Sequence, residues 1–232
     1  MSEFIGVSAP LYNELISKGN ILIAGMTGSG KSTFLAGLIN SILYRGADKH
    51  LMVLIDPKKV EFIDYEQTIH CIRYVTEPKD IEKTLEDTLG LILKRFDYMK
   101  SKRLKEYDGT RIHLFVDEMA DLMLTSKKSA DLLQRICQIG RAAGVQVILA
   151  TQCPLREVIP TRIKVNFPIV VGLHTQNAQQ SRNILGVGGC ESLPMYGEAL
   201  ILYPSLGVKH EKVPKIPEEW LCKIIEEDKR GA

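Results

Sequence analysis

The sequence lacks the features that mark secreted, membrane-spanning and metal-scaffolded proteins. Its five cysteines are scattered and none forms a C-x-x-C pair, which argues against a disulfide framework or a zinc site and favours a reducing cytoplasm. The N-terminal stretch MSEFIGVSAP has no basic segment followed by an apolar core, and no apolar run approaches the roughly 18 residues that span a bilayer. We therefore expect a cytoplasmic protein with no membrane segment of its own.

The chain also has little excess charge. Its 30 lysines and arginines nearly balance its 28 aspartates and glutamates, which gives a net charge of +2. Any binding to a polyanion must therefore come from local basic clusters. Hydrophobic residues make up 45% of the chain and charged residues 25%, values that are ordinary for a globular protein. With 232 residues and no repeat or linker, the sequence predicts one domain over residues 1–232.

Apolar runs that favour strands alternate with stretches of helical periodicity. Expected strands cover residues 21–24, 51–55, 112–116, 145–150, 169–172 and 199–203. Expected helices cover residues 32–43, 80–105, 129–143 and 217–228, with Leu93 on the apolar side of the second and Gly144 placed to stop the third. This alternation predicts an α/β fold, with a mostly parallel central sheet flanked by helices on both faces.

The segment GMTGSGKS, residues 25–32, follows the first expected strand and matches the pattern G-x-x-x-x-G-K-[ST]. Glycines let the backbone N–H groups converge on phosphate oxygens, and the helix that starts here adds the positive end of its dipole. Lys31 is expected to reach the β- and γ-phosphates, and Ser32 to ligate Mg²⁺. The expected phosphate-binding residues are Gly25, Thr27, Gly28, Ser29, Gly30, Lys31, Ser32 and Thr33. The expected cofactors are ATP and Mg²⁺.

Two acids, Asp117 and Glu118, end the apolar run HLFV. In P-loop enzymes an aspartate in this place holds Mg²⁺ through its water shell, and Glu118 is expected to orient and deprotonate a water that attacks the γ-phosphate. Gln152 follows the run VQVILAT and is expected to sense the γ-phosphate or hold the attacking water. A plain turn or helix cap is the alternative for Gln152. The acid pair favours hydrolysis over phosphate transfer to a small acceptor, which is the kinase alternative.

The chain resembles the motor domain of FtsK/SpoIIIE DNA translocases, in the FtsK–HerA branch of RecA-like ATPases. The matching segments occur in family order: IAGMTGSGKS (23–32), LIDPKKVEF (54–62), VDEMADLM (116–123), RAAGVQVILATQ (141–152), IKVNFP (163–168) and SRNIL (181–185). The resemblance implies a RecA-like P-loop NTPase fold and a homo-hexameric ring, with ATP between subunits and double-stranded DNA through the pore. The residues that match the family's nucleotide and hydrolysis positions are Lys31, Ser32, Asp117, Glu118 and Gln152. Asp56 and Lys58 match its D-P-K segment near the nucleotide, with no role assigned.

Such a ring implies an arginine from the neighbouring subunit, because a cation delivered in trans stabilises the transferring phosphoryl group. Arg141 and Arg182 lie in matching segments, and both stay candidates. The alternatives are a cation at a helix C-terminus for Arg141 and a surface ion pair for Arg182.

DNA contact is expected on the basic loop PLREVIPTRIKVN, residues 154–166, because basic loops bind phosphates with little regard to sequence. The candidate residues are Arg156, Arg162 and Lys164, with a solvated loop as the alternative. A second basic cluster, residues 94–107, is interspersed with acids on an expected helix, which favours a solvated face.

Three departures from the family pattern bear on the part that faces DNA and the neighbouring subunit. The family typically carries Arg-Pro after its Thr-Gln, whereas this chain has Cys153 and Pro154 there. The family's usual arginine after the N-x-P-T segment is replaced near residues 169–170, and its lysine before the S-R-x-I-L segment appears as Ala178. We expect no membrane anchor, extra motor subdomain or winged-helix module in these 232 residues. The expectation is a minimal ATP-driven double-stranded DNA translocase of a mobile element, plasmid or phage, with an unknown recruitment partner. A nucleotide-dependent DNA- or partner-binding adaptor is the alternative.

Overall fold

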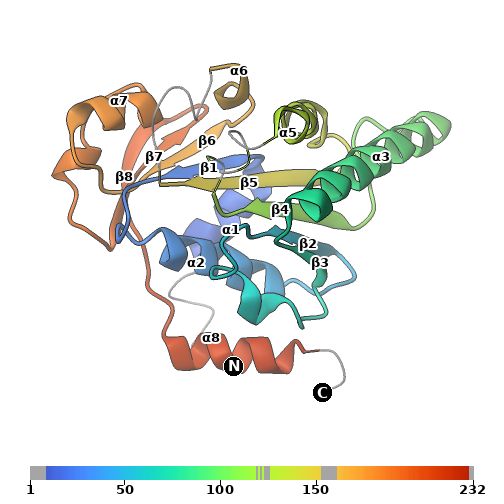
Figure 1. Ribbon diagram of the computed structural model, residues 1–232, viewed down its shortest axis with the longest axis horizontal. Coiled ribbons are helices and arrows are strands. Elements are labelled where there is room, and N and C mark those ends of the chain that lie inside the picture. Colours follow the sequence, from blue (N-terminus) through green and yellow to red (C-terminus); the bar gives the residue numbers. More distant parts are fainter. Residues whose placement is uncertain (1–8, 119, 121, 123–125, 153–160, 230–232) are drawn as a thin grey trace.

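The computed structural model describes residues 9–118, 120, 122, 126–152 and 161–229, and it shows one twisted sheet between two layers of helices (Figure 1). The strands lie in the order β3-β2-β4-β5-β1-β6-β7-β8. Their bounds are β1 Ile21–Ala24, β2 His50–Ile55, β3 Cys71–Val75, β4 Arg111–Val116, β5 Val145–Thr151, β6 Ile169–Gly172, β7 Glu198–Tyr203 and β8 Gly207–Lys212. Strands β3 to β6 in this order pair in parallel, and β7 and β8 continue the sheet antiparallel. The prediction of an α/β fold with a mostly parallel sheet is confirmed.

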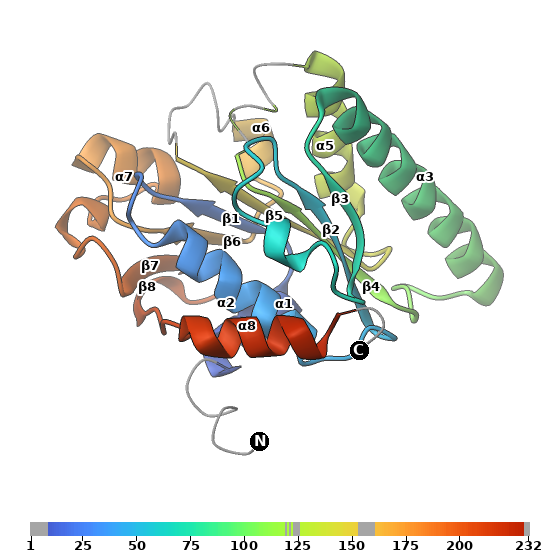
Figure 2. The same cartoon turned by 60° about the horizontal axis from the view of Figure 1, so that its bottom comes forward.

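Each face of the sheet is buried under its own set of helices (Figures 1 and 2). One face carries α1 (Ala9–Lys18), α2 (Lys31–Leu43) and α8 (Glu218–Glu227), and the other carries α3 (Pro78–Lys102), α5 (Lys127–Ile139), α6 (Thr161–Lys164) and α7 (Ala178–Leu185). Short 3₁₀ turns cover Ile63–Tyr65 and Cys190–Ser192. Alternate residues of β1 point to opposite faces, so Ile21 and Ile23 join one apolar cluster while Leu22 joins the other. Among the described helices, none has the length and apolar content needed to cross a membrane.

The elements that the sequence did not predict are short or solvent-facing. They are α1, β3, α6, α7 and β8. Strand β8 reads GVKHEK and forms the exposed edge of the sheet, where charged side chains are tolerated and no apolar alternation is required. Gly144 does not stop the third expected helix, because α5 already ends at Ile139. With a φ of +71°, Gly144 instead closes the turn that leads into β5.

The long helix α3 differs from its prediction in which side chains it buries. Leu93 is 52% exposed, and the buried stripe passes through Ile92 instead, as a strict 3.6-residue period requires over so many turns. Arg95 is buried, although the basic cluster around it was expected to be solvated. Its guanidinium donates to the carbonyls of Ala143 (2.8 Å) and Thr110 (2.9 Å), so it fastens α3 to the ends of two strands.

A chain of polar side chains crosses the interior of the sheet near its amino edge. Gln146 Nε2 donates to the carbonyl of Gly19, which leaves Gln146 Oε1 as an acceptor for His113 Nδ1 at 2.7 Å. His113 Nε2 must then accept, so the donor across the 2.9 Å contact is His50 Nδ1. Burial lowers the pKa of His113 to about 3 and that of His50 to about 4. Both rings are therefore neutral in the folded protein.

This histidine chain predicts a loss of stability in mild acid. Unfolded His113 takes up a proton near pH 6.5, whereas folded His113 resists protonation until the pH nears its lowered pKa. The contribution of His113 to the unfolding free energy is therefore fully present above pH 6.5. Between pH 8 and pH 5 this contribution falls by about 2 kcal/mol. The positive charges of Arg45 and Arg111 lower the pKa of His50 further, as burial does, while the negative charge of Asp48 raises it.

Urea unfolding at the two pH values measures this effect. Replacing His210, which is exposed and pairs with Glu198 at the sheet edge, gives the control variant His210→Gln. It should keep the full pH dependence, whereas His113→Gln should flatten it. An unfolding free energy of the wild-type protein that is equal at pH 8 and pH 5 would contradict the proposed contribution of His113 and His50 to the pH dependence of stability.

Candidate nucleotide-binding site

The glycine-rich loop joins the end of β1 to the start of α2 at the carboxyl edge of the sheet. Gly28 and Gly30 have φ angles of +80° and +89°, in the left-handed region that favours glycine. Gly25 is needed for space instead, because a Cβ there would lie 2.6 Å from Leu173 Cβ and 2.6 Å from Ser29 Oγ. The loop is therefore held tightly against the chain that follows β6, as the 3.0 Å bond from Met26 N to the carbonyl of His174 also indicates.

A cleft of about 610 Å³ opens above this loop. The expected phosphate-binding residues from Thr27 to Thr33 all line it, as does Gln152, whereas Gly25 lies beneath the loop. Sequence reasoning missed the opposite wall, which is formed by Leu173, Tyr196, Gly197, Val213 and Lys215. Tyr196 is 74% exposed, and no local motif marks it, since it reaches the loop only through the folding of the sheet.

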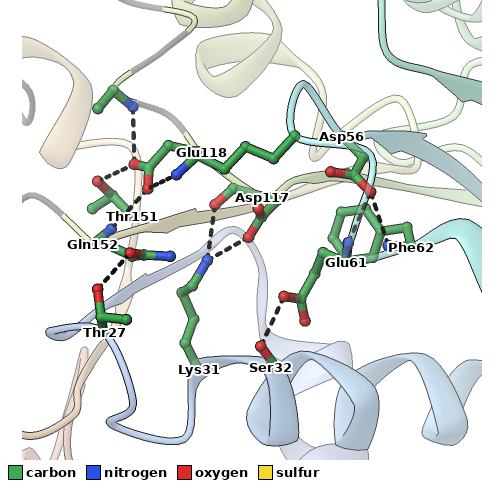
Figure 3. Close-up of polar contacts among 12 residues, drawn as sticks. Thr27, Lys31, Ser32, Asp56, Glu61, Phe62, Asp117, Glu118, Thr151 and Gln152 are labelled. Atoms are coloured by element: carbon green, nitrogen blue, oxygen red, sulfur yellow. Dashed lines mark hydrogen bonds and ion pairs between the residues drawn. The ribbon is translucent and has the colours of Figure 1, made fainter.

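Lys31 and Asp117 form a buried ion pair at the base of the cleft (Figure 3). Their side chains are 6% and 5% exposed, and Lys31 Nζ bonds Asp117 Oδ1 and approaches the Asp117 carbonyl at 3.5 Å. The pair joins the start of α2 to the end of β4. Two charges buried this deeply are tolerated because each compensates the other.

Glu118 is 1% exposed, and donors from three segments surround its carboxylate. Oε1 accepts from Thr151 Oγ1 at 2.7 Å and from the Ala120 N–H at 3.3 Å, and Oε2 accepts from the Gln152 N–H at 3.2 Å and from Lys58 Nζ at 3.3 Å. Figure 3 shows Glu118 facing Thr151 and Gln152 across the ends of β4 and β5. This carboxylate is thus held next to Gln152, which lines the cleft.

Gln152 connects the end of β5 to the glycine-rich loop. Its Oε1 accepts a hydrogen bond from Thr27 Oγ1 at 2.7 Å, while its backbone N–H is bonded to Glu118. Gln152 directly follows β5, which pairs with β1, the strand that leads into the loop. The residue therefore lies between the proposed base and the loop.

The segment 56–62, which follows β2, folds over the same edge. Asp56 is fully buried, and its Oδ2 accepts from the backbone N–H groups of Glu61 (2.9 Å) and Phe62 (3.0 Å). Glu61 Oε2 in turn accepts from Ser32 Oγ at 2.8 Å (Figure 3). Desolvation by burial raises the pKa of Glu61. The structure thus shows that Asp56 shapes this segment, that Lys58 pairs with Glu118, and that Glu61, which sequence reasoning missed, reaches Ser32.

The two candidate arginines lie outside the cleft of their own chain. Arg141 is exposed at the amino edge of the sheet, where it lines a small cavity with Arg111 and Gln146. Arg182 is exposed on α7, where its charge lowers the pKa of Glu191 after stronger contributions from backbone hydrogen bonds. Neither placement selects one arginine over the other.

The expected DNA-binding residues are only partly described. Arg156 lies outside the described residues, together with Cys153 and Pro154. Arg162 is exposed on α6. Lys164 is half-buried, and its Nζ donates to the carbonyl of Asn183 at 3.1 Å, which ties α6 to α7. Lys164 therefore has a structural contact in addition to any role in binding.

The donor set at the base of the cleft suits a hard divalent cation that is shared with phosphate. In the described residues, no group of three or more His, Cys, Asp or Glu side chains is arranged to hold a metal ion by itself. Ser32, next to Lys31 in the loop, supplies a hydroxyl, and Asp117, the partner of Lys31, supplies a carboxylate. Mg²⁺ takes few protein oxygens and completes its shell with water and substrate phosphates, so these residues fit it.

Comparison with known sequences gives one consistent family. The pattern of the FtsK/SpoIIIE family matches residues 2–115 and 109–155. DNA translocase FtsK of Oceanobacillus iheyensis is 36% identical over 83% of this chain and 27% of its own length. DNA translocase FtsK of Helicobacter pylori is 32% identical over 95% of the chain and 28% of its own. DNA translocase SpoIIIE of Bacillus subtilis is 34% identical over 82% and 27%. The chain thus spans about a quarter of the length of these relatives.

Solved structures share the fold at lower identity. The cytoplasmic domain of the type VII secretion ATPase EccC of Thermomonospora curvata superposes with a TM-score of 0.78 at 19% identity, over 92% of this chain and 28% of that one. The pCW3 conjugation coupling protein TcpA, solved with ATPγS, gives a TM-score of 0.77 at 23% identity, over 91% and 66%. These likenesses show a P-loop ATPase fold.

The packing beneath the loop predicts opposite effects for two glycine-to-alanine changes. Gly25→Ala places a methyl group against Leu173 and Ser29, and it should lower the unfolding free energy by about 1–3 kcal/mol. Gly90→Ala in α3 is the matched control, because its Cβ would have nothing within 4 Å. It should raise stability by about 0.5–1 kcal/mol, since alanine favours a helix interior. Urea unfolding of both variants checks this, and a neutral Gly25→Ala would show that the loop is not closely packed.

Proposed function

The chain belongs to the FtsK/SpoIIIE family, and from this premise and the geometry of the cleft we propose that it is an ATP-hydrolysing motor that moves along double-stranded DNA. One observation carries the proposal. At the mouth of the phosphate loop, Glu118 and Gln152 are joined to each other, and Gln152 is joined to Thr27 of the loop. A general base and a water-orienting amide are thereby connected to the element that would hold the phosphates.

The cleft has room for a nucleoside triphosphate with its phosphates over the loop. A Cβ added at Gly28 would lie 3.6 Å from Met195, and one added at Gly30 would lie 3.6 Å from Tyr196. Glycines thus keep a passage open between the loop and the segment before β7. The nucleoside would lie along Tyr196, Val213 and Lys215, the wall of the cleft away from Gln152 and Asp117. Binding of ATP therefore uses the walls of one continuous cleft.

Binding would replace the ion pair at the base of the cleft. Lys31 would leave Asp117 for the β- and γ-phosphate oxygens. The negative charge of the phosphates would then compensate the Lys31 ammonium, as Asp117 did before. Asp117 and Ser32 would then hold Mg²⁺, which supplies charge neutralisation on the phosphate oxygens when bound. Each buried charge thus exchanges one partner for another.

Hydrolysis would depend on Glu118 and Gln152. Glu118 would accept a proton from a water in line with the γ-phosphate, and Gln152 would orient that water through its side chain. Thr151, Ala120 and Lys58 hold the Glu118 carboxylate in place before the nucleotide arrives. Such preorganisation lowers the cost of reaching the reactive geometry.

Translocation would require several copies of the chain. We propose a homo-hexameric ring in which Arg141 or Arg182 of one subunit completes the site of the next, because both arginines lie away from the cleft of their own chain. Double-stranded DNA would pass through the ring along the basic segment that includes Arg156, Arg162 and Lys164. The relatives named as DNA translocases support this partner. Location in the cytoplasm, a recruitment partner and an origin on a mobile element, plasmid or phage stay predictions.

The proposal predicts ATP hydrolysis that duplex DNA stimulates several-fold. Lys31→Ala should abolish both binding and turnover, because the cation for the phosphates is lost. Glu118→Gln should retain binding and lose turnover by about 100-fold or more, because the amide cannot accept the proton. Release of phosphate and binding of a fluorescent nucleotide are measured on the same samples. A rate that is equal with and without DNA would count heavily against a motor.

A triplex-displacement assay separates the motor from an adaptor that binds DNA without moving. The adaptor gains support from the cysteine at 153 and the alanine at 178, where the family carries basic residues. A motor removes a short third strand from duplex DNA in an ATP-dependent manner, while an adaptor leaves the triplex intact. Glu118→Gln is the matched control, because it should bind nucleotide and leave the triplex in place.

A further inference from the structure

The backbone of segment 56–62 is built to aim one carboxylate at the phosphate loop. Lys59 adopts a φ of +59°, a left-handed conformation that is uncommon for a residue with a side chain. Asp56 binds the N–H groups at the far end of the turn, and Phe62 is fully buried with its ring 5.9 Å from that of Phe115. Strain of this kind is retained where the surrounding structure imposes it. Here it fixes the position from which Glu61 extends.

The hydrogen bond from Ser32 to Glu61 sets the orientation of the hydroxyl. A serine hydroxyl has one hydrogen to donate and two lone pairs that accept or ligate. Donation to Glu61 Oε2 at 2.8 Å directs the hydrogen toward segment 56–62. A lone pair of Ser32 Oγ is then available to a cation. Without the carboxylate, that hydrogen is free to point toward the cation and oppose binding.

The charges around Glu61 favour a cation at the same place. Asp117 and Asp56 lie near enough to repel the Glu61 carboxylate, and Lys31 lies near enough to attract it. When Lys31 turns to phosphate, these carboxylates lose part of their compensation. A divalent ion held by Ser32 and Asp117 would restore it.

We propose that Glu61 is a positioning residue of the divalent-cation site, which orients Ser32 and adds the negative charge of a nearby carboxylate. The inference rests on the proposed nucleotide binding and deepens it. It differs from a simple resting contact, in which Glu61 merely occupies Ser32 and has to leave before the cation binds. The two readings make opposite predictions for a variant that lacks the carboxylate.

Cation affinity tests the proposal directly. Binding of Mn²⁺ to the complex of the protein with a non-hydrolysable ATP analogue is followed by electron paramagnetic resonance. Glu61→Ala should weaken Mn²⁺ binding by about 10-fold or more, as the loss of a group that orients a metal ligand does. Glu61→Gln should recover part of the loss, because its amide oxygen can still accept the Ser32 hydrogen. Glu66→Ala removes an exposed acid a few residues further on and should bind Mn²⁺ as the wild type does.

A second measurement excludes a general defect. Affinity for the fluorescent ATP analogue in EDTA should not be lower for Glu61→Ala than for the wild type, because Lys31 and the backbone of the phosphate loop are unchanged. Mn²⁺ binding by Glu61→Ala that equals or exceeds that of the wild type would overturn the inference, and so would an equal loss of analogue affinity in EDTA. Failure of the wild type to bind the analogue at all would instead overturn the proposed function.

Discussion

The buried ion pair between Lys31 and Asp117 is the interaction on which the rest of the site depends. Removing two charges from water costs several kcal/mol for each ion, and only a close partner offsets that cost. Neither residue can therefore lose its partner without gaining another. A phosphate for Lys31 and a cation for Asp117 meet this condition together, so each of the two ligands would favour binding of the other.

The order of the strands brings the remaining groups to this pair. β2, β4, β5 and β1 are consecutive in the sheet and run parallel, so their carboxyl ends lie along one edge. Asp56, Asp117, Thr151 and Gly25 each lie at or directly after one of these ends. Segments that are far apart in the sequence thus become neighbours without any long loop. Since β7 and β8 continue the sheet past β6, they also supply the wall that carries Tyr196.

The sequence predicted the positions of those site residues that belong to a short local motif. The glycine-rich loop and the acid pair after β4 are both contiguous with an apolar strand, so their positions follow from one short segment each. Glu61 and Tyr196 carry no such local signal, because their roles arise from contacts with loop residues about 30 and 165 positions away. Arg95 shows the same limit in the core. The basic cluster around it predicted a solvated face, but the carbonyls of Ala143 and Thr110, just before β5 and β4, hold it inside.

The polar groups at the base of the cleft already have partners within the chain. Ser32 is bonded to Glu61, Thr27 to Gln152, and Glu118 to donors from β5 and from segment 56–62. Binding free energy at such a site is the difference between the new contacts and those that they replace. Contacts that stay in place, such as those of Glu118, cost nothing on binding and would preserve the geometry that the proposed hydrolysis needs. Those that must break, above all Lys31 with Asp117, would couple the two ligands, because a cation compensates the buried carboxylate that Lys31 leaves when it turns to phosphate.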